Sequence, residues 1–146
     1  MEILSLQQAI EKYPEEIKAA IERAKTNQNK LAAFHNAFFN NFLCIKIPGN
    51  ASLDAPIEIC SNLKITTAEN VIIIAEENSS ATILEVLESK NSQQQLKSQI
   101  LSLHIKENAR ITYCTIQNLS SEDYNFSTRH AVLEKDASLN WIDCFL

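Results

Sequence analysis

The sequence is poor in glycine and proline, with one Gly and three Pro among 146 residues. Phosphate-binding loops such as GxxxxGK(S/T) and GxGxxG need several glycines, because the backbone must approach the phosphates closely. A chain with a single glycine cannot build such a loop. Nucleotide binding by these motifs is therefore excluded.

Long apolar runs and an excess of basic residues are also missing. The longest aliphatic run, VIIIA at 71–75, is far too short to span a bilayer. The N-terminal stretch MEILSLQQAIEKYPEE lacks the basic and apolar regions of a secretory signal, so we expect a cytoplasmic protein without membrane contact. The 13 Lys and Arg against 18 Asp and Glu leave a net charge of -5. That balance argues against nucleic acid as a partner, since no basic surface is available to neutralise phosphates.

Cysteines are few and widely spaced, at Cys44, Cys60, Cys114 and Cys144. The sequence contains no CxxC or CxxH pair that could form a zinc knuckle. In a reducing cytosol we expect four free thiols. The simplest interpretation is that they are small buried apolar side chains rather than metal ligands.

The first 42 residues have helical patterns. Ser5 and Gln8 fit a capping box, and Pro14 suits the first position of a second helix. Two apolar stripes at helical spacing follow: Ile17, Ala20, Ile21 and Ala24, then Leu31, Phe34, Ala37 and Phe38. His35 lies beside the second stripe, where we expect a hydrogen-bonded structural histidine. We predict a helical arm over residues 1–42.

From residue 43 onward the sequence repeats. Four segments resemble one another: PGNASLDAPI (48–57), EENSSATILE (76–85), KENARITYCT (106–115) and EKDASLNWID (134–143). Their shared Asn or Asp positions are Asn50, Asn78, Asn108 and Asp136, which are spaced by 28, 30 and 28 residues. Asn and Asp tolerate the left-handed backbone conformation of tight corners. A fixed period of this length indicates a solenoid.

Alignment on these four anchor residues produces columns of similar side chains. Odd offsets are mostly apolar, as in Ile45, Ile73, Leu103 and Ala131; Ile47, Ala75, Ile105 and Leu133; Leu53, Ala81, Ile111 and Leu139; and Ala55, Ile83, Tyr113 and Trp141. Even offsets are mostly polar, so one face of each strand is directed inward. We predict a mainly β protein, a parallel β-helix over residues 43–146 preceded by the short α-helical region. A β-sandwich or barrel is disfavoured, since neither needs columns in register at a fixed period. The polar stretch 88–99 is predicted to be a loop.

One charged residue interrupts an apolar column, where Arg129 follows Leu43, Val71 and Leu101. An unpaired charge inside a coil is costly, so Arg129 must reach the edge or meet an acid or a bound anion. A solvated corner residue is the simpler interpretation.

Other candidates for chemistry are isolated along the chain. His104 and Cys114 lie at outward offsets and could bind a soft metal, but the sequence offers no third ligand. His130 is similarly isolated. No Ser-His-Asp set and no acid–base pair of carboxylates is recognisable. We therefore expect no catalysis by this chain alone.

Several segments resemble the SufB/SufD family, the scaffold subunits that partner the ATPase SufC in iron–sulfur cluster biogenesis. They are KLAAFHNAFFNNFLCIKIPGNASLDAPIEI (30–59), NVIIIAEENSSATILE (70–85), LHIKENARITYCTIQN (103–118) and YNFSTRHAVLEKDASLNWI (124–142). The resemblance implies a right-handed parallel β-helix. It is closer to SufD, notably in IAEENSSATILE and in Ile105, where SufB-type subunits tend to carry a cysteine.

The resemblance also implies a function and partners. It indicates a non-catalytic, SufD-like scaffold subunit of a SufBCD-type complex, with SufB-like and SufC-like partners. No cofactor is expected on this chain alone, although an iron–sulfur cluster is possible in the full assembly. The family lines the inside of its β-helix with polar groups, which marks Gln117 and Arg129 as candidate cofactor-binding residues. Family members continue past the equivalent of Leu146 with more coils.

Two alternatives come from other classes of protein. A truncated β-helix module could act only in structure or oligomerisation, since the last coil, NWIDCFL, would expose an apolar strand with open edges and favour a homodimer. A carbohydrate-acting β-helix enzyme would need clustered carboxylates and aromatic platforms. With only one Trp in the chain, we disfavour the enzyme.

Overall fold

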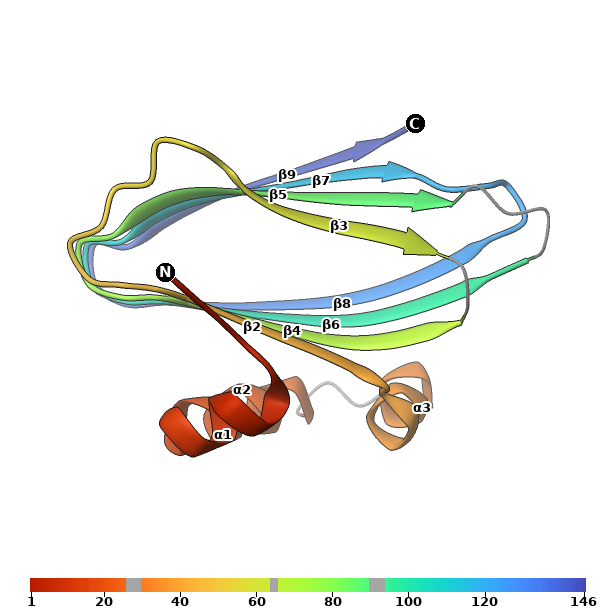
Figure 1. Cartoon of the computed structure of the whole chain (residues 1–146), viewed down its shortest axis with the longest axis horizontal. Coiled ribbons are helices and arrows are strands. Elements are labelled where there is room, and N and C mark those ends of the chain that lie inside the picture. The colour runs from red at the N-terminus through yellow and green to blue at the C-terminus, as the bar shows by residue number, and fades with distance from the viewer. Residues whose placement is uncertain (26–29, 64–65, 90–93) are drawn as a thin grey trace.

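The computed structural model describes residues 1–25, 30–63, 66–89 and 94–146. It contains three short helices near the N-terminus, followed by a succession of strands (Figure 1). The elements are β1 (Glu2–Leu4), α1 (Leu6–Lys12), α2 (Pro14–Lys25), α3 (Lys30–Phe38), β2 (Asn41–Ile47), β3 (Ile57–Leu63), β4 (Thr67–Ala75), β5 (Ser80–Ser89), β6 (Leu96–Ile105), β7 (Arg110–Asn118), β8 (Tyr124–Leu133) and β9 (Ser138–Phe145).

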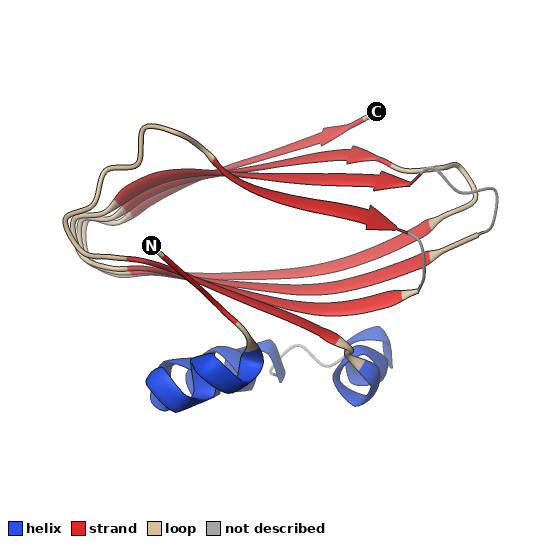
Figure 2. Ribbon diagram, viewed as in Figure 1, coloured by secondary structure: helices blue, strands red, loops and turns tan. Residues whose placement is uncertain are grey.

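The strands alternate between two facing sheets. One sheet has the order β1-β2-β4-β6-β8 and the other the order β3-β5-β7-β9. Successive turns of the chain pair in parallel, and only β1 adds to its neighbour β2 in the antiparallel direction. The chain thus winds as a β-solenoid of about four turns, which confirms the predicted parallel β-helix (Figure 2).

The corners between the two sheets are built on the four anchor residues. Asn50, Asn78, Asn108 and Asp136 have φ angles between 57° and 59°. For most L residues this left-handed conformation costs about 1–2 kcal/mol, and Asn and Asp lower that cost through local hydrogen bonds. The corners also stack on one another, because Asn78 donates a side-chain hydrogen bond to Asn50 Oδ1 over 3.2 Å. The predicted period of 28 to 30 residues is therefore confirmed as the length of one turn.

The apolar columns form the core on the corner side of the coil. Strand register places Ile45 against Ile73 and Ile73 against Leu103, and all three are at most 2% exposed. Each fully buried aliphatic side chain of this kind stabilises the fold by about 1.5–3 kcal/mol.

The predicted column of Ala55, Ile83, Tyr113 and Trp141 is wrong in the first turn. Ile57, not Ala55, pairs with Ile83, although Ser52 still bridges to Ser80. The segment between these points is two residues longer than in the later turns, and it contains Pro56, which has no backbone N–H to donate to a ladder. Pairing resumes at the first residue after the proline.

The helices cover the outer face of the sheet that contains β2, β4, β6 and β8 (Figure 2). The capping box of Ser5 and Gln8 is confirmed, and Pro14 is the first residue of α2. Ile17 and Ala20 are buried in a small cluster that includes Ile72 and Ile74 of β4. The helices begin at Leu6 and end at Phe38, and β2 begins at Asn41. The division of the chain into a helical arm (1–42) and a β-helix (43–146) stays a prediction.

The apolar stripe of α3 is directed away from the sheet. Leu31, Phe34 and Phe38 are between 48% and 64% exposed, whereas Ala32 and His35 are buried. The side toward the sheet carries the small Ala32, which lets the helix approach closely. His35 Nδ1 lies 2.9 Å from Ser98 Oγ, as expected of a hydrogen-bonded structural histidine.

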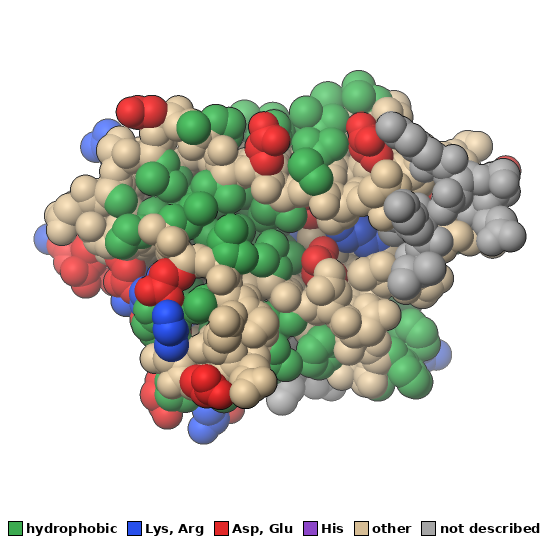
Figure 3. Space-filling model, viewed as in Figure 1, with side chains coloured by type: hydrophobic (Ala, Val, Ile, Leu, Met, Phe, Trp, Pro, Cys, Tyr) green, Lys and Arg blue, Asp and Glu red, His purple; other side chains and the backbone are tan. Residues whose placement is uncertain are grey.

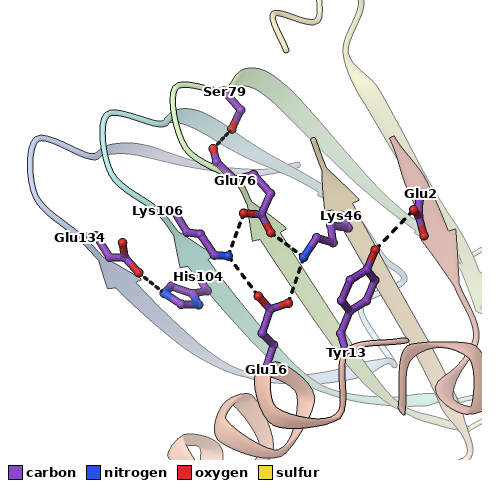
Figure 4. A network of polar contacts seen from close by, with 9 residues as sticks. All are labelled: Glu2, Tyr13, Glu16, Lys46, Glu76, Ser79, His104, Lys106 and Glu134. Atoms are coloured by element: carbon purple, nitrogen blue, oxygen red, sulfur yellow. Dashed lines mark hydrogen bonds and ion pairs between the residues drawn. The ribbon is translucent and has the colours of Figure 1, made fainter. Parts of the chain in front are cut away.

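A charge network fastens α2 to the sheet (Figure 4). Glu16 contacts Lys46 and Lys106, each at 3.1 Å, and Glu76 contacts the same two lysines at 2.5 and 2.8 Å. Partial burial by itself raises the pKa of Glu16, but hydrogen bonds and charge from Lys106 and Lys46 outweigh it and hold that pKa below its usual value. We call these four residues the α2 clamp. It joins the helix to three successive turns of the coil.

Within the described ranges, no helix has the length and apolar character needed to cross a membrane.

Candidate functional site

The interior of the coil is divided into an apolar half and a polar half. Away from the corners, the space between the sheets is lined by polar side chains, which are buried in the middle turns and exposed at Ser127 and Asp143 toward the last turn. Charged side chains are visible in a hollow right of centre in Figure 3. We call this set the polar row: Glu69, Glu85, Lys97, Gln99, Tyr113, Thr115, Ser127, Arg129 and Asp143. Buried polar groups on this scale need internal partners, and the row supplies them.

Glu85 is the most buried member of the polar row, with a relative exposure of 0%. Gln99 Nε2 donates to its Oε1 over 2.5 Å, and the Tyr113 hydroxyl donates to its Oε2 over 3.0 Å. Burial, followed by the charge of Glu85, raises the pKa of Tyr113 far above its usual range. The hydroxyl therefore keeps its proton and remains a donor to the carboxylate.

Lys97 adds a buried positive charge beside two carboxylates. Its side chain is 2% exposed, and its Nζ lies 3.4 Å from Glu69 Oε2 and 3.5 Å from Glu85 Oε1. Glu69 also accepts a hydrogen bond from Asn41 Nδ2 over 2.8 Å. Buried ion pairs of this kind rarely add net stability, because the cost of removing water from the charges is large. Their presence favours a functional or specificity role over a purely stabilising one.

Arg129 continues the polar row into the last turn. It forms an ion pair with Asp143, and it donates to Thr115 Oγ1 over 3.3 Å and to Ser127 Oγ over 3.1 Å. Its guanidinium lies 5.3 Å from the centre of the Trp141 ring. The side chain is 19% exposed. The interpretation as a solvated corner residue is therefore wrong, since Arg129 is directed inward and meets an acid.

Gln117 also lies on the inward side of its strand. In the register of the sheet it stands between Leu87, which is 1% exposed, and Phe145. Its Oε1 accepts a hydrogen bond from Asn125 Nδ2 over 2.8 Å. Gln117 and Arg129 thus both belong to the polar interior, but through separate partners. Their role in cofactor binding stays a prediction.

Of the remaining candidates, His104 and His130 line a common pocket, whereas the cysteines are dispersed. His104 lies on the outer face, where its Nε2 is 2.8 Å from Glu134 Oε1. All four cysteines are free thiols; Cys44 is buried, Cys114 is half-buried, and Cys60 and Cys144 are exposed. The interpretation as buried apolar side chains therefore holds only for Cys44. Among the residues that the structure describes, no three His, Cys, Asp or Glu side chains are grouped to hold a metal ion.

The central members of the polar row were missed by the sequence reading. Residues 88–99 were predicted as a loop, yet β5 runs to Ser89 and β6 begins at Leu96, so Lys97 and Gln99 are strand residues. Residues 90–93 of that stretch lie outside the described part. A signal was available, because the offset nine residues before the anchors gives Asn41, Glu69, Gln99 and Ser127, which the structure shows in register. This column lies only two residues before the column of Leu43, Val71, Leu101 and Arg129, so one further step of the alternation finds it.

These features define a class of protein: a parallel β-helix whose interior carries a buried polar row. The particular family follows from comparison with known sequences. Residues 59–146 match the family described as SUF system FeS cluster assembly, SufBD core domain. The chain belongs to the SufBD family.

Curated relatives carry the same family name. An iron–sulfur cluster assembly SufBD family protein of Staphylococcus epidermidis is 27% identical over 119 residues, which is 79% of this chain and 26% of the relative. Proteins of the same name from Staphylococcus haemolyticus and Staphylococcus aureus are each 26% identical over the same shares. The chain therefore spans about a quarter of the length of the curated relatives it matches.

Proposed function

We propose that the chain is a SufD-like scaffold segment of a SufBCD-type iron–sulfur cluster assembly complex, without catalytic activity of its own. The observation that carries the proposal is the buried polar row inside a SufBD-family coil. A coil built only for stability would fill this space with apolar side chains, since these avoid the cost of removing charges from water. The polar row is the part of the coil that a cluster-assembly role would use.

The cargo in this proposal is a nascent iron–sulfur cluster. The described residues offer no group of three metal ligands, so the proposal assigns the cluster's ligands to other parts of the assembly. Gln117 and Arg129 carry N–H groups, and hydrogen bonds to cluster sulfurs are one way in which proteins adjust a cluster. We assign these two residues to that supporting role. The proposed partners are SufB-like and SufC-like subunits in the cytoplasm, with no part for nucleic acid or membrane.

Affinity capture tests the proposal. The tagged chain is co-expressed with the SufB-like and SufC-like proteins of its own organism, and the retained proteins are identified by mass spectrometry. We expect both partners to be retained and both to be absent with the tag alone. Failure to retain either partner, with the chain folded by circular dichroism, would overturn the proposal.

A second candidate function is an oligomerising structural module. In the last turn Ile142, Phe145 and Leu146 are between 43% and 77% exposed, and β8 and β9 each have one unpaired edge. Open apolar edges of this kind favour association with another copy. Light scattering distinguishes the cases, because this function predicts a homodimer of twice 16.5 kDa, and a monodisperse monomer contradicts it.

A further inference from the structure

The outer side of α3 carries apolar side chains that are directed to solvent. Leu31, Phe34 and Phe38 lie along one side of the helix and are between 48% and 64% exposed. Lys30 is the only Lys, Arg, Asp or Glu residue of α3. The helix lies apart from α1 and α2 at the lower right of Figure 1, and hydrophobic side chains gather at the same place in Figure 3. An apolar surface depleted of charge is typical of the core of a protein interface.

Two aromatic side chains of β8 extend this surface. Phe126 is in register with Ser98, which contacts His35 of α3, so Tyr124 and Phe126 lie on the same outer face of the sheet as the helix. Their rings are stacked with centres 6.4 Å apart, and the two side chains are 55% and 39% exposed. We call the set of five exposed apolar residues the α3 patch: Leu31, Phe34, Phe38, Tyr124 and Phe126.

The α3 patch contains both a ridge and a hollow. A hollow of about 280 Å³ lies between α3 and β8, and its lining includes Leu31, Phe126 and Thr128. Phe34 and Phe38 form the ridge on α3, with ring centres 5.0 Å apart. A ridge and a hollow on one face make that face self-complementary, because a two-fold axis between them brings the ridge of each copy to the hollow of the other.

The size of the α3 patch matches that of a small dimer interface. Its side chains are between 39% and 64% exposed. Since an aromatic side chain can bury about 150–250 Å², the five together offer roughly 500 Å² of apolar surface. Exposed patches of this size often mark interaction sites. Two copies would bury roughly 1,000 Å² between them, which is about the least that a specific interface needs.

We propose that the α3 patch binds a second copy of this chain in a two-fold symmetric dimer. Phe38 of each copy enters the hollow of the other copy and packs beside Phe126. Because the patch itself holds no charged side chain, the two identical surfaces meet without repulsion between like charges. This dimer uses a different face from the last turn of the coil. It does not depend on the cluster-assembly role, so either proposal can fail while the other stands.

Sedimentation equilibrium of the full 146-residue chain tests whether the dimer forms. Interfaces near the lower size limit are weak, so we expect a dissociation constant in the micromolar range. The mass should rise from 16.5 kDa toward twice that value as the protein concentration is raised from about 1 to 500 µM. A mass that stays at 16.5 kDa over the whole range would overturn the proposal.

A matched pair of variants locates the contact. Phe38→Asp places a charge in the α3 patch, and we expect it to weaken association by about tenfold or more, because the charge would lose water on binding. Phe145→Asp makes the same change in the last turn, where Phe145 is 68% exposed against 64% for Phe38, and it should leave association unchanged. Circular dichroism checks that both variants fold. Unchanged association of folded Phe38→Asp, or loss of association in Phe145→Asp alone, would overturn the proposal.

Mixing two further variants tests the two-fold arrangement. Phe38→Lys and Phe126→Glu should each associate poorly alone, since every dimer then sets one charge against an aromatic ring at both contacts. In the mixture, one contact pairs the introduced lysine with the introduced glutamate and the other keeps both phenylalanines. We therefore expect association in the mixture to be at least about tenfold tighter than in either variant alone. Equal association in the mixture and in the separate variants would contradict the proposed contact between Phe38 and Phe126.

Discussion

At the scale of single residues, the four corners show how side chain and backbone conformation are matched. Every described residue with a positive φ is an Asn or Asp at the start of a turn, and the single glycine is not among them. The scarcity of glycine in the sequence therefore does not mean that left-handed corners are absent. It means that Asn and Asp fill them, and their side chains can also bond from turn to turn.

Replacement of a corner residue tests this match. Asn78→Ala should destabilise the fold by about 1–2 kcal/mol, because alanine has no local hydrogen bond to lower the cost of a left-handed backbone. Asn78→Gly should cost less, since glycine adopts this conformation freely. Urea denaturation measures both, with Asn140→Ala, in an exposed strand position, as the control. Equal stability of the alanine and glycine variants would contradict the account.

The polar row makes a second residue-scale prediction. Glu85→Ala should destabilise the fold by about 3–5 kcal/mol, because it leaves the buried Lys97, Gln99 and Tyr113 without their common partner. Glu107→Ala, at an exposed corner, should stay within about 0.5 kcal/mol of the unchanged protein. Chemical denaturation checks both. If the two variants lost similar stability, Glu85 could not hold the row together.

At the scale of elements, the sequence predicts the places of strands and corners better where the repeat is regular than where it is interrupted. The capping box, the corner spacing and the inward columns could all be read from the chain, because each follows a local rule. The burial of α3 could not, since Leu31 and Phe34 are apolar yet exposed, and only the approach to β4 and β6 decides which side of the helix is covered. The start of β6 is hidden in the sequence because Lys97 and Gln99, near its beginning, are polar although they are directed inward.

The α2 clamp predicts how helix docking depends on pH. Glu16 and Glu76 have pKa values held below their usual 4.5, so their contribution is fully present above that value and is lost as the pH falls through the lowered pKa. Lys46 and Lys106 have pKa values raised above 10.5 by Glu76 and Glu16 against the effect of burial, so their contribution is lost only as the pH rises above that range. The stability from the clamp should therefore be constant between about pH 5 and 10.

Removing one acid isolates the clamp. Glu16→Gln should cost about 1 kcal/mol at pH 7 and less at pH 3, because lowering the pH toward the lowered pKa of Glu16 progressively protonates the carboxylate of the unchanged protein. Glu15→Gln is the matched control, because Glu15 lies in the same first turn of α2 but is exposed. Urea denaturation at both pH values gives the comparison. An equal cost at pH 3 and pH 7 would contradict a charge-based clamp.

Helix docking also predicts the reactivity of Cys44. This thiol is fully buried beneath the helices, and burial raises its pKa to about 11. At neutral pH, raising the pKa from 9 to about 11 lowers the fraction of reactive thiolate about a hundredfold. Burial also limits the access of reagents to the sulfur. Mass spectrometry of alkylated peptides should find Cys60 and Cys144 modified first and Cys44 last. Modification of Cys44 at the rate of Cys60 would show that the helices are not docked in solution.

At the scale of the whole molecule, the fold and the site were predictable to different extents. The parallel β-helix could be predicted because a solenoid repeats its rules every turn, so four copies reinforce one signal. Arg129 and Gln117 could be placed inside, but the full polar row could not, since Glu85 and Lys97 come from segments that the sequence reading treated as apolar strand and polar loop. Glu85 and Lys97 lie on different sheets, so only the way the two sheets face each other across the coil brings those two side chains together.

The central claim is that a SufBD-family coil uses its polar interior in cluster assembly. The direct test is an apolar replacement of the whole buried network, Glu69→Leu, Glu85→Leu, Lys97→Met, Gln99→Leu and Tyr113→Phe, in the proposed complex with SufB-like and SufC-like subunits. Replacing a complete buried ion-pair network by apolar residues is often neutral for stability, so the variant should fold and retain its partners. Cluster formation is then followed by visible absorption during reconstitution. The account predicts that the variant complex forms cluster at least about tenfold more slowly, the loss expected when charge-assisted contacts are removed. A folded variant complex that forms cluster at the unchanged rate would contradict it.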